Sequence, residues 1–415
     1  MNKRVLLIGG NYSPELTGIG KYNGEMIEML ASKGYHCTVV TSFPYYPHWQ
    51  VQQPYTESSR WFKKEVKEPN GQMGRAIVIF RCPHYIPNKP TGLKRMISDL
   101  SFCTAAFVKI IQLLFKKKYD YILVVAPPFQ LGLLGILYKK IKGGKLFYHI
   151  QDLQIDAARD FNLIKSKFII AILLKIEKYI LKKADVVSSI SDGMIKKIQD
   201  KFKREVVFFP NWVDTNLFFP LPEKGALRKQ FNFQATDKIV LYSGAIGEKQ
   251  GLEAILESAQ VLDDQPDLKF VICGSGPYKK KLEEIAVHKN LKNVYFLPLQ
   301  PIEKLNLFLN MADIHLVLQK ANATDLVMPS KLTAILSVGG LAIITASEGC
   351  SLHDVVSLHK MGILIEPEHS ASLTLAISES VKNNNRSIHE NARSYAQKYL
   401  SINEIFRAYT GHMNN

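Results

Sequence analysis

Short apolar runs alternate with amphipathic helical patterns along almost the whole chain, and this alternation limits the possible folds more than any other feature. The chain opens with an apolar run at 5–9, a helical pattern through 26–30 and a second apolar run at 37–41. A strand, a helix and a strand in this order imply a parallel sheet with helices on its faces. The same order begins again at Ile239. The sequence therefore predicts an α/β protein with two doubly wound halves.

A proline-rich segment separates the two halves. Three prolines between 210 and 222 enclose the sequence NWVDTNLFF, and the second series of strands and helices starts after it. A length of 415 residues suits two domains of ordinary size. We expect an N-terminal domain over 1–208 and a C-terminal domain over 209–394, with a helix at 395–413 that crosses back onto the first domain.

The charge balance of the chain favours anionic partners. The chain carries 53 Lys and Arg residues against 37 Asp and Glu residues, a net charge of +16. Nucleic acids, phosphorylated substrates and anionic membranes all attract such a protein. Nucleic acid is the weakest of these options, because the basic residues are spread out and no recognition motif accompanies them. The five cysteines are scattered without a CxxC pair, which indicates a reducing cytosol and no zinc site.

The apolar segments predict a protein that does not span a membrane. The first apolar run is too short for a cleavable signal, and no segment reaches about 18 apolar residues without a charge. Lysines at 116–118 and along 165–183 lie beside apolar residues, which predicts peripheral attachment to the anionic, cytoplasmic face of a membrane. A core-packed helix with a solvated lysine face is the alternative reading of the second segment.

Candidate site residues of the first half follow predicted strands. Gly18 and Gly20 lie in the loop after the first strand, where a chain can pass close to a ligand. A later strand ends in His149, and Asp152 and Asp156 follow it. Ligands of open parallel sheets bind beyond the carboxyl ends of the strands. Turn glycines and a buried histidine at a strand end are the structural alternatives.

Residues 43–75 are rich in Pro, Tyr and Trp, which predicts a long loop with an aromatic surface. Such a loop is either an irregular insertion that packs on its own aromatic rings or a lip that binds a sugar or a lipid headgroup. Both ligands favour aromatic faces. The sequence alone leaves the two readings open.

Two glycine-containing loops of the second half suit a phosphate group. Gly244 and Gly247 follow one predicted strand, and Gly274 and Gly276 follow the next. Such loops let backbone N–H groups approach an anion, and Lys249 adds a positive charge after the first loop. The sequence has no G-x-x-x-x-G-K-[ST] motif, which disfavours a P-loop ATPase.

A third phosphate-binding candidate is the predicted helix start at Ser330. We expect Ser330 to be the N-cap, because it follows a proline and precedes apolar residues at helical spacing. A helix start offers N–H groups and the positive end of the helix dipole to an anion. Lys331 lies in the first turn, where a cation is unfavourable unless an anion binds beside it.

Several of these segments together resemble glycosyltransferase family 4, whose members have the two-domain GT-B fold. PNWVDTNLFFP is similar to the hinge signature of the family, with Trp212 in place of a glycine. SGAIGEKQG, ICGSGPYKKKLEE and ADVVSSIS resemble three further family motifs, and Lys249 matches the family lysine. The segments NYSPELTGIGKY, HIQDLQID and PSKLTAILSVGG are most similar to colanic-acid-type exopolysaccharide glycosyltransferases, in a fucosyltransferase branch.

The resemblance implies a retaining transfer of a sugar from GDP-fucose, or another GDP- or UDP-sugar, to a lipid-linked oligosaccharide in exopolysaccharide or capsule biosynthesis. It implies no metal and no other cofactor, because protein cations would stabilise the leaving diphosphate. The resemblance also assigns the acceptor to the N-terminal domain over 1–208 and the nucleotide-sugar donor to the C-terminal domain over 209–394. The implied catalytic residues are His149, Asp152 and Lys249, and the implied donor-binding residues are Gly18, Gly20, Gly244, Gly247, Gly274, Gly276, Asp325, Ser330, Lys331 and Leu332.

One departure from the family concerns its pair of glutamates, spaced E-x7-E. The two positions are Leu326 and Ala334 here, and neither side chain ionises. Asp325 is adjacent to the first position and is a partial substitute. The second glutamate usually holds the donor ribose, so ribose binding must differ. A nucleotide-sugar epimerase of the same fold and a non-catalytic nucleotide-sugar binding module are the alternatives that the sequence leaves open.

Overall fold

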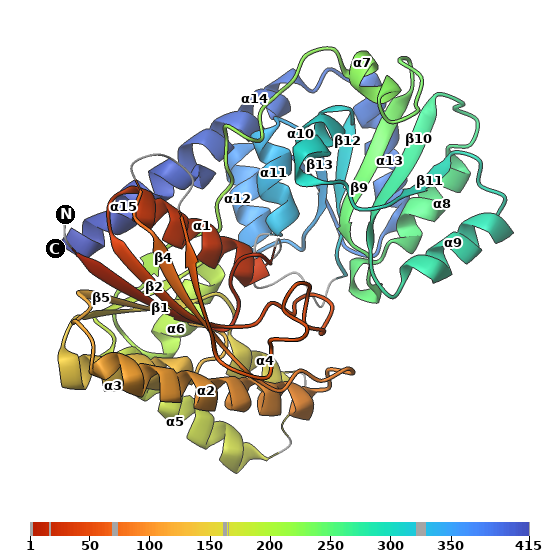
Figure 1. The fold of residues 1–415 in the computed structure, drawn as a ribbon. Helices are drawn as coiled ribbons and strands as arrows, with labels where there is room; N and C mark the ends of the chain where they lie inside the picture. Colours follow the sequence, from red (N-terminus) through yellow and green to blue (C-terminus); the bar gives the residue numbers. More distant parts are fainter. Residues whose placement is uncertain are drawn as a thin grey trace. The chain divides into compact units, whose positions relative to one another are not determined.

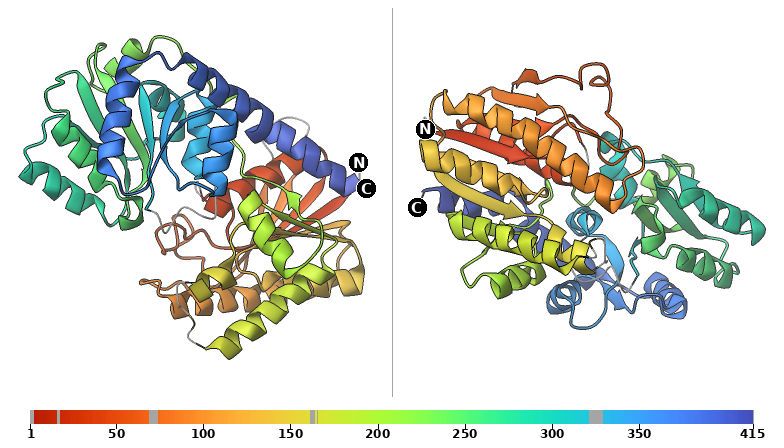
Figure 2. Two further views of the ribbon diagram at one scale, coloured as in Figure 1. Left: turned by 180° about the vertical axis from the view of Figure 1, so that it is seen from behind. Right: turned by 90° about the horizontal axis from the view of Figure 1, so that it is seen from below.

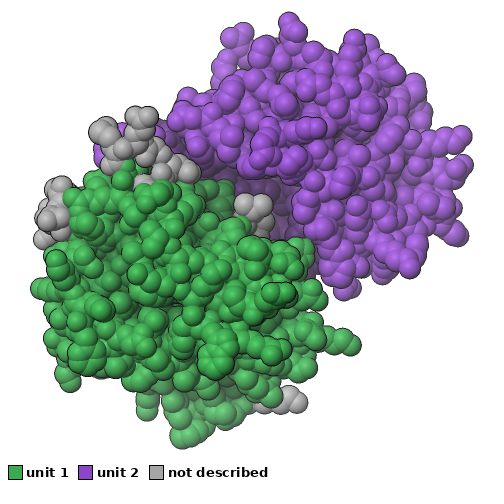
Figure 3. All heavy atoms as spheres, in the orientation of Figure 1, with its two compact units in different colours: residues 1–209, 410–415 green, residues 210–409 purple. Residues whose placement is uncertain are grey.

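The chain forms two compact units, each built on one β-sheet (Figure 1). The structure is a computed structural model that describes residues 3–15, 18–68, 74–160, 164, 166–320 and 329–414. Unit 1 comprises residues 1–209 with 410–415, and unit 2 comprises residues 210–409 (Figure 3). The observed division thus lies one residue from the expected boundary. Only 410–415 of the tail belong to unit 1, whereas the sequence predicted a longer segment from 395.

Unit 1 has, among the described residues, a sheet with the strand order β3-β4-β2-β1-β5-β6-β7-β8. Its strands are β1 Arg4–Gly9, β2 His36–Ser42, β3 Lys63–Lys67, β4 Ile77–Cys82, β5 Tyr121–Ala126, β6 Lys145–Ile150, β7 Val186–Ser189 and β8 Val207–Phe208. Its helices are α1 Gly18–Ser32, α2 Gly92–Leu114, α3 Leu131–Lys142, α4 Gln154–Asp160, α5 Lys167–Lys183 and α6 Asp192–Lys201. All paired strands are parallel except β3.

The central strands of unit 1 are buried along most of their length, as expected for a sheet with helices on both faces. Every residue of β5 is buried. Helices α2, α3 and α5 lie side by side on one face, and α1 lies on the other (Figure 2). Strand β1 pairs with both β2 and β5, so the strand order reverses at this point. A loop after β1 therefore leaves the sheet where an open crevice is expected.

The prediction that residues 43–75 form only a loop is wrong in part. Strand β3 lies within this segment and pairs antiparallel with β4. Its sequence KKEVK gives no apolar signal, so long-range contacts must hold it. Glu65 pairs with the buried Arg81 at 3.1 Å, and Arg81 also donates to the carbonyl of Ser13 at 2.6 Å. An edge strand rich in charge is also a poor template for aggregation.

Unit 2 has, in its described part, a parallel sheet with the strand order β11-β10-β9-β12-β13-β14. Its strands are β9 Lys238–Ala245, β10 Leu268–Ser275, β11 Val294–Leu297, β12 Ile314–Val317, β13 Leu341–Thr345 and β14 Ile363–Ile365. Its helices are α7 Lys224–Lys229, α8 Glu253–Val261, α9 Lys279–His288, α10 Ile302–Asn310, α11 Ser330–Ser337, α12 Ser351–His359, α13 Ser370–Lys382 and α14 Arg386–Tyr395. The last helix, α15 Ile402–Asn414, begins in unit 2 and ends in unit 1. A 3-10 turn follows β9 at Glu248–Gln250, and a π-helical turn links α14 to α15 at Ala396–Leu400.

Strand β9 contributes side chains to two separate hydrophobic cores, one on each face of the sheet. Ile239 and Leu241 pack in one core, whereas Val240 and Tyr242 pack in the other. This alternation follows from the pleat of a strand, which directs successive side chains to opposite faces. Because both faces are covered, both sets must be apolar, and the strand reads as one hydrophobic run in the sequence.

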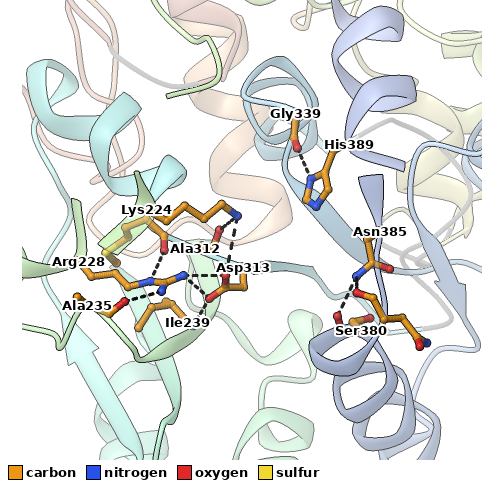
Figure 4. Close-up of polar contacts among 12 residues, drawn as sticks. Lys224, Arg228, Ala235, Ile239, Ala312, Asp313, Gly339, Ser380, Asn385 and His389 are labelled. Carbon is orange, nitrogen blue, oxygen red and sulfur yellow. Dashed lines mark hydrogen bonds and ion pairs between the residues drawn. The ribbon is translucent and has the colours of Figure 1, made fainter. Parts of the chain in front are cut away.

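An ion pair fastens α7 to the amino edge of this sheet (Figure 4). Both oxygens of Asp313, the residue before β12, accept hydrogen bonds from Arg228 at 2.7 Å. The same carboxylate accepts from the backbone N–H of Ile239 at 2.8 Å. Lys224 donates to the carbonyl of Ala312 at 2.7 Å. This polar cluster fixes the start of β9 and β12, so the opposite edge of the same strands is positioned as well.

The segment that resembles a hinge signature pairs with the tail of the chain. Val213 donates to the carbonyl of Leu400 at 2.8 Å, and the Trp212 ring packs edge-on against Phe406 with centroids 5.1 Å apart. Trp212 is buried. The large side chain that replaces a glycine is therefore a packing residue. Residues 410–415 belong to unit 1, where Tyr121 donates from its hydroxyl group to the carbonyl of Met413 at 2.7 Å.

Candidate active site

The strand order of unit 2 reverses at β9, which pairs with β10 on one side and β12 on the other. The loops after β9 and β12 leave the sheet at its carboxyl edge, where ligands of open α/β sheets bind. Two backbone contacts organise this edge. Lys320 N–H donates to the carbonyl of Lys249 at 2.9 Å, and Gln319 N–H donates to Thr345 Oγ1 at 2.8 Å. The two loops are thus tied together and to the end of β13.

Lys331 is the most unusual residue of this edge. Its ammonium nitrogen lies 3.9 Å from the centroid of the Tyr242 ring, and among the described residues this nitrogen is buried without a hydrogen-bond partner. Burial lowers the pKa of Lys331 from 10.5 to about 7. A buried, unpaired amine is costly, so such groups are usually paired. An anion that bound here would supply the missing partner and would keep the amine protonated.

Gly244 lies beside this lysine. A Cβ atom at Gly244 would lie 3.6 Å from Lys331 Nζ and 3.7 Å from its Cδ and Cε atoms, which are ordinary contact distances. The Lys331 side chain therefore passes the end of β9 at Gly244, without depending on the missing side chain of the glycine. Tyr242, whose hydroxyl donates to the carbonyl of Ala245 at 2.6 Å, holds the same turn from within.

Gly274 and Gly276 must be glycines for a structural reason that the sequence motif does not reveal. A Cβ atom at Gly274 would lie 1.9 Å from the carbonyl oxygen of Gly244, and one at Gly276 would lie 2.0 Å from that of Ile246. Neither distance is possible for a real side chain. These two glycines let the loops after β9 and β10 touch backbone to backbone, so they shape the site through the β9 loop.

Gly247 makes an internal contact with its backbone, whereas the side chain of Lys249 is exposed. The N–H of Gly247 donates to Gln250 Oε1 at 3.0 Å, so this group already has a partner. Lys249 lies in the 3-10 turn and is exposed, and its backbone carbonyl is used by the β12 loop. The exposed side chain of Lys249 lies in the loop region that follows β9.

Helix α11 begins at the same edge of the sheet, after residues 321–328, which lie outside the described part of the chain. Its N-cap is Pro329, and Ser330 is the first helical residue, so the prediction that Ser330 is the N-cap is wrong. A proline with its fixed φ can cap a helix start without a side-chain hydrogen bond. Leu332 is fully buried in a core of unit 2 and contributes only packing with its side chain. The predicted positions Asp325 and Leu326 lie outside the described residues.

Unit 1 contains a cavity of about 380 Å³ at the carboxyl edge of its sheet. Its wall includes residues that follow β1, β2, β5 and β6, together with one face of α2. The α2 residues recur at helical spacing, at Gly92, Arg95, Met96 and Asp99. This volume lies within the range of small-molecule pockets. Tyr45, Tyr46 and Trp49 also line it, so part of the aromatic segment 43–75 faces a cavity.

Comparison with known proteins gives the family of the chain. A model of the glycosyl transferases group 1 matches residues 223–399, which lie entirely in unit 2. The Escherichia coli K12 protein WcaI, a glycosyl transferase assigned to colanic acid biosynthesis, is 38% identical over 417 residues that cover 98% of each chain. The chain belongs to the group 1 glycosyltransferases. It is therefore an enzyme, and the resemblance found in its motifs is confirmed at the level of this group.

Solved structures agree on the fold of this glycosyltransferase. Sucrose-phosphate synthase from Thermosynechococcus elongatus has a TM-score of 0.73 at 18% identity and covers 100% of this chain and 98% of its own. HepE from Anabaena, solved in complex with UDP and glucose, has a TM-score of 0.68 at 14% identity and covers both chains completely. At these identities the likeness concerns the fold, which is GT-B as predicted.

The two glycines predicted in unit 1 of the glycosyltransferase have different surroundings. Gly18 has a φ of +61°, which favours glycine, and it lines the cavity beside Tyr46. Gly20 makes room for Glu15 instead, because a Cβ atom there would lie 2.4 Å from Glu15 Oε2. Glu15 is buried and accepts hydrogen bonds from the backbone of Tyr45 and Tyr46, each at 2.9 Å. It thereby holds one wall of the cavity.

The three residues predicted near the end of β6, His149, Asp152 and Asp156, also have different surroundings in the structure. His149 is buried, its Nδ1 lies 3.0 Å from Ser188 Oγ, and burial lowers its pKa to about 3. It does not line the cavity of unit 1 in the described structure, so its role in sugar transfer stays a prediction. Asp152 is exposed and lines that cavity. Asp156 is buried and pairs with Lys201, which indicates a structural role.

Sequence reasoning missed several polar residues that line or support the cavity. Arg95 and Asp99 lie four residues apart on α2, so they share one face of the helix, and this spacing could have marked a functional face. His84 follows β4 and carries no sequence signal at all. Glu15 lies in the loop after β1, and only its burial distinguishes it from a solvated surface acid.

Proposed function

We propose that this glycosyltransferase moves a sugar, with retention of anomeric configuration, from GDP-fucose or another GDP- or UDP-sugar to a lipid-linked oligosaccharide in exopolysaccharide biosynthesis. The buried amine of Lys331 at the carboxyl edge between β9 and β12 carries the proposal, because it has no hydrogen-bond partner among the described residues and a bound anion would supply one. The diphosphate of a nucleotide sugar is the anion that a glycosyltransferase of this group handles. The full-length similarity to WcaI supports a role in a colanic-acid-like polysaccharide.

The leaving diphosphate develops negative charge as the sugar–phosphate bond breaks. Lys331 supplies a cation from the sheet side, and the exposed Lys249 supplies a second from the neighbouring turn. The first turn of α11 adds backbone N–H groups and the positive end of a dipole. We expect these groups to stabilise the leaving group without a metal ion. Wild-type activity should then persist in EDTA, and Lys249→Ala should lower turnover about 100-fold while the thermal unfolding midpoint is retained.

The lipid-linked acceptor is supported by the outer surface of unit 1. Helices α2 and α5 expose large apolar side chains, including Leu93 at 69%, Leu100 at 62% and Phe168 at 75%. Lysines flank them on both helices. Among the described residues, α2 alone is long and apolar enough to cross a membrane, yet it packs against β2, β4 and α3 as a layer of the fold. Peripheral attachment to an anionic cytoplasmic membrane surface fits this arrangement.

The central test combines nucleotide binding with turnover. A panel of GDP- and UDP-sugars is screened for thermal stabilisation, since a ligand at 100 times its dissociation constant stabilises the fold by about 2.7 kcal/mol. The stabilising sugar is then incubated with a lipid-linked acceptor, and the product linkage is read by NMR. Transfer with retention supports the proposal. Isomerised donor without acceptor would indicate an epimerase, and binding without any turnover would indicate a non-catalytic module.

A further inference from the structure

The family resemblance already assigns the acceptor to the N-terminal domain. We propose that His84 positions an uncharged pyranose of this acceptor in the cavity of unit 1, through a hydrogen bond to one of the sugar's hydroxyl groups. The inference rests on the proposed sugar transfer and deepens it, because it names the class of acceptor sugar and a residue that selects it. The lining comes from unit 1 alone, from the loops at the carboxyl edge of the sheet and from one face of α2.

His84 is the reason to expect a ligand with hydroxyl groups. Its ring lies edge-on to Tyr45, with centroids 4.9 Å apart, and 6.1 Å from the Phe102 ring. Both ring nitrogens are buried, and within the described part of the chain neither has a hydrogen-bond partner. Burial lowers the pKa of His84 to about 4, so the ring is neutral at pH 7 and offers one donor and one acceptor. A hydroxyl group, which also donates and accepts, matches both.

The other residues of the cavity wall match both the apolar faces and the polar edge of a sugar ring. Asp99 accepts a hydrogen bond from Gln154 Nε2 at 2.6 Å through one oxygen, and the contacts of the described residues leave its other oxygen for a ligand. Asp152 adds a second carboxylate. The rings of Tyr45 and Trp49 form an apolar side of the same cavity. Sugar rings present C–H groups on their faces and hydroxyl groups at their edges, so they complement an aromatic side that faces polar groups.

The charge of the cavity selects against an anionic ligand. Its lining holds two carboxyl groups, Asp99 and Asp152, against the guanidinium of Arg95, which lies 5.1 Å from the centre of the Trp49 ring. Burial raises the pKa of Asp99 to about 6, which shows that negative charge is already unfavourable there. A uronic acid would add another carboxylate to this site. A neutral hexose or deoxyhexose would not, and a diphosphate belongs with the lysines of unit 2.

The test uses the whole chain and methyl glycosides as probes. Methyl glycosides of glucose, galactose and fucose, with methyl glucuronide as the charged comparison, are titrated at millimolar concentrations and followed by saturation-transfer NMR. We expect one neutral glycoside to bind and the glucuronide to bind about tenfold more weakly. His84→Leu should weaken the neutral glycoside about fivefold to tenfold, as expected for one lost hydrogen bond. His48→Leu, an exposed histidine outside the cavity wall, is the matched control.

Nucleotide-induced thermal stabilisation is measured on every variant and separates this inference from the proposed function. A His84→Leu protein that is still stabilised by nucleotide is folded, so its loss of glycoside binding supports the role of His84. Unchanged glycoside binding in that variant overturns this role. If no neutral glycoside binds wild type while nucleotide does, the acceptor pocket is wrong and the donor proposal stands. Trp49→Leu provides a second variant, which should weaken all neutral glycosides without changing nucleotide binding.

Discussion

The amine of Lys331 couples stability to donor binding at the scale of one residue. Its pKa is lowered to about 7 in the fold against 10.5 in an unfolded chain, so the unfolded state binds more protons between these values and stability rises with pH across pH 7 to 10. Lys331→Met removes this dependence, and at pH 7 it should raise the melting temperature by a few degrees. Differential scanning calorimetry at several pH values measures both effects.

The same substitution should weaken the binding of a nucleoside diphosphate about tenfold or more, because a charge-assisted contact is lost. Wild-type affinity should fall as pH rises above 7, since the free amine then loses its proton and must regain it to bind the anion. Isothermal titration calorimetry follows this slope, which Lys331→Met should flatten. Lys229→Met, an exposed lysine of α7, is the control. An unchanged affinity in the Lys331 variant would remove this residue from the donor site.

Asp99 makes stability depend on pH in the opposite direction to Lys331. Burial raises its pKa from 3.8 to about 6, so the folded state binds more protons than the unfolded state between these values. Stability contributed by the protonated carboxyl is therefore lost as pH rises from about 4 to 6. Asp99→Asn keeps an acceptor for Gln154 and should make the protein more stable than wild type at pH 7.5. Thermal unfolding is measured against pH for wild type, Asp99→Asn and the control Asp200→Asn, which changes an exposed residue. If the melting temperatures of wild type and Asp99→Asn change in parallel with pH, Asp99 does not cause this dependence.

At the scale of elements, the contact between the carboxyl ends of β9 and β10 decides the shape of the donor edge. A Cβ atom at Gly274 would overlap the carbonyl oxygen of Gly244, so Gly274→Ala must push the two strand ends apart. We expect a loss of about 1–3 kcal/mol in the free energy of unfolding and weaker nucleotide binding. Gly411→Ala in α15, where nothing lies within 4 Å, should be neutral or slightly stabilising. Urea denaturation of the two variants provides the comparison.

At the scale of the whole molecule, net charge and exposed apolar side chains act together at a membrane. A charge of +16 attracts the protein to anionic lipid, and the exposed ring of Phe168 with Ile169 and Ile172 on α5 can enter the interface. Replacement of these three residues by serine should abolish most co-sedimentation with anionic vesicles. High salt should weaken wild-type binding. Val287→Ser, which alters an exposed apolar residue of unit 2, should bind as wild type.

Zwitterionic vesicles complete this experiment. Equal binding of wild type to anionic and zwitterionic vesicles, without an effect of salt, would exclude the electrostatic part of the proposal. Equal binding of the serine variant and wild type to anionic vesicles would place the contact on another surface, with the apolar ends of α2 as the next segment to change.

Local features of the chain were sufficient for the fold. The βαβ series and the boundary near 209 could be read from the sequence, because strands buried on both faces must be apolar along their length, as β5 and β9 are. The position of Lys331 in the first turn of a helix could also be predicted, because it depends on local sequence, whereas its role in donor binding stays a prediction. The motif resemblance identified the chemistry of the group for the same reason.

Contacts between distant residues decided the rest. Gly20, Gly274 and Gly276 looked like ligand-facing turns, and only the tertiary structure shows that Glu15 or neighbouring backbone fills the space beside them. His84 has no sequence signal, because packing against Tyr45 and Phe102 buries its ring nitrogens, which have no hydrogen-bond partner among the described residues. Periodicity reports which face of an element is buried. It cannot report what lies opposite that face, since the partner comes from another part of the chain.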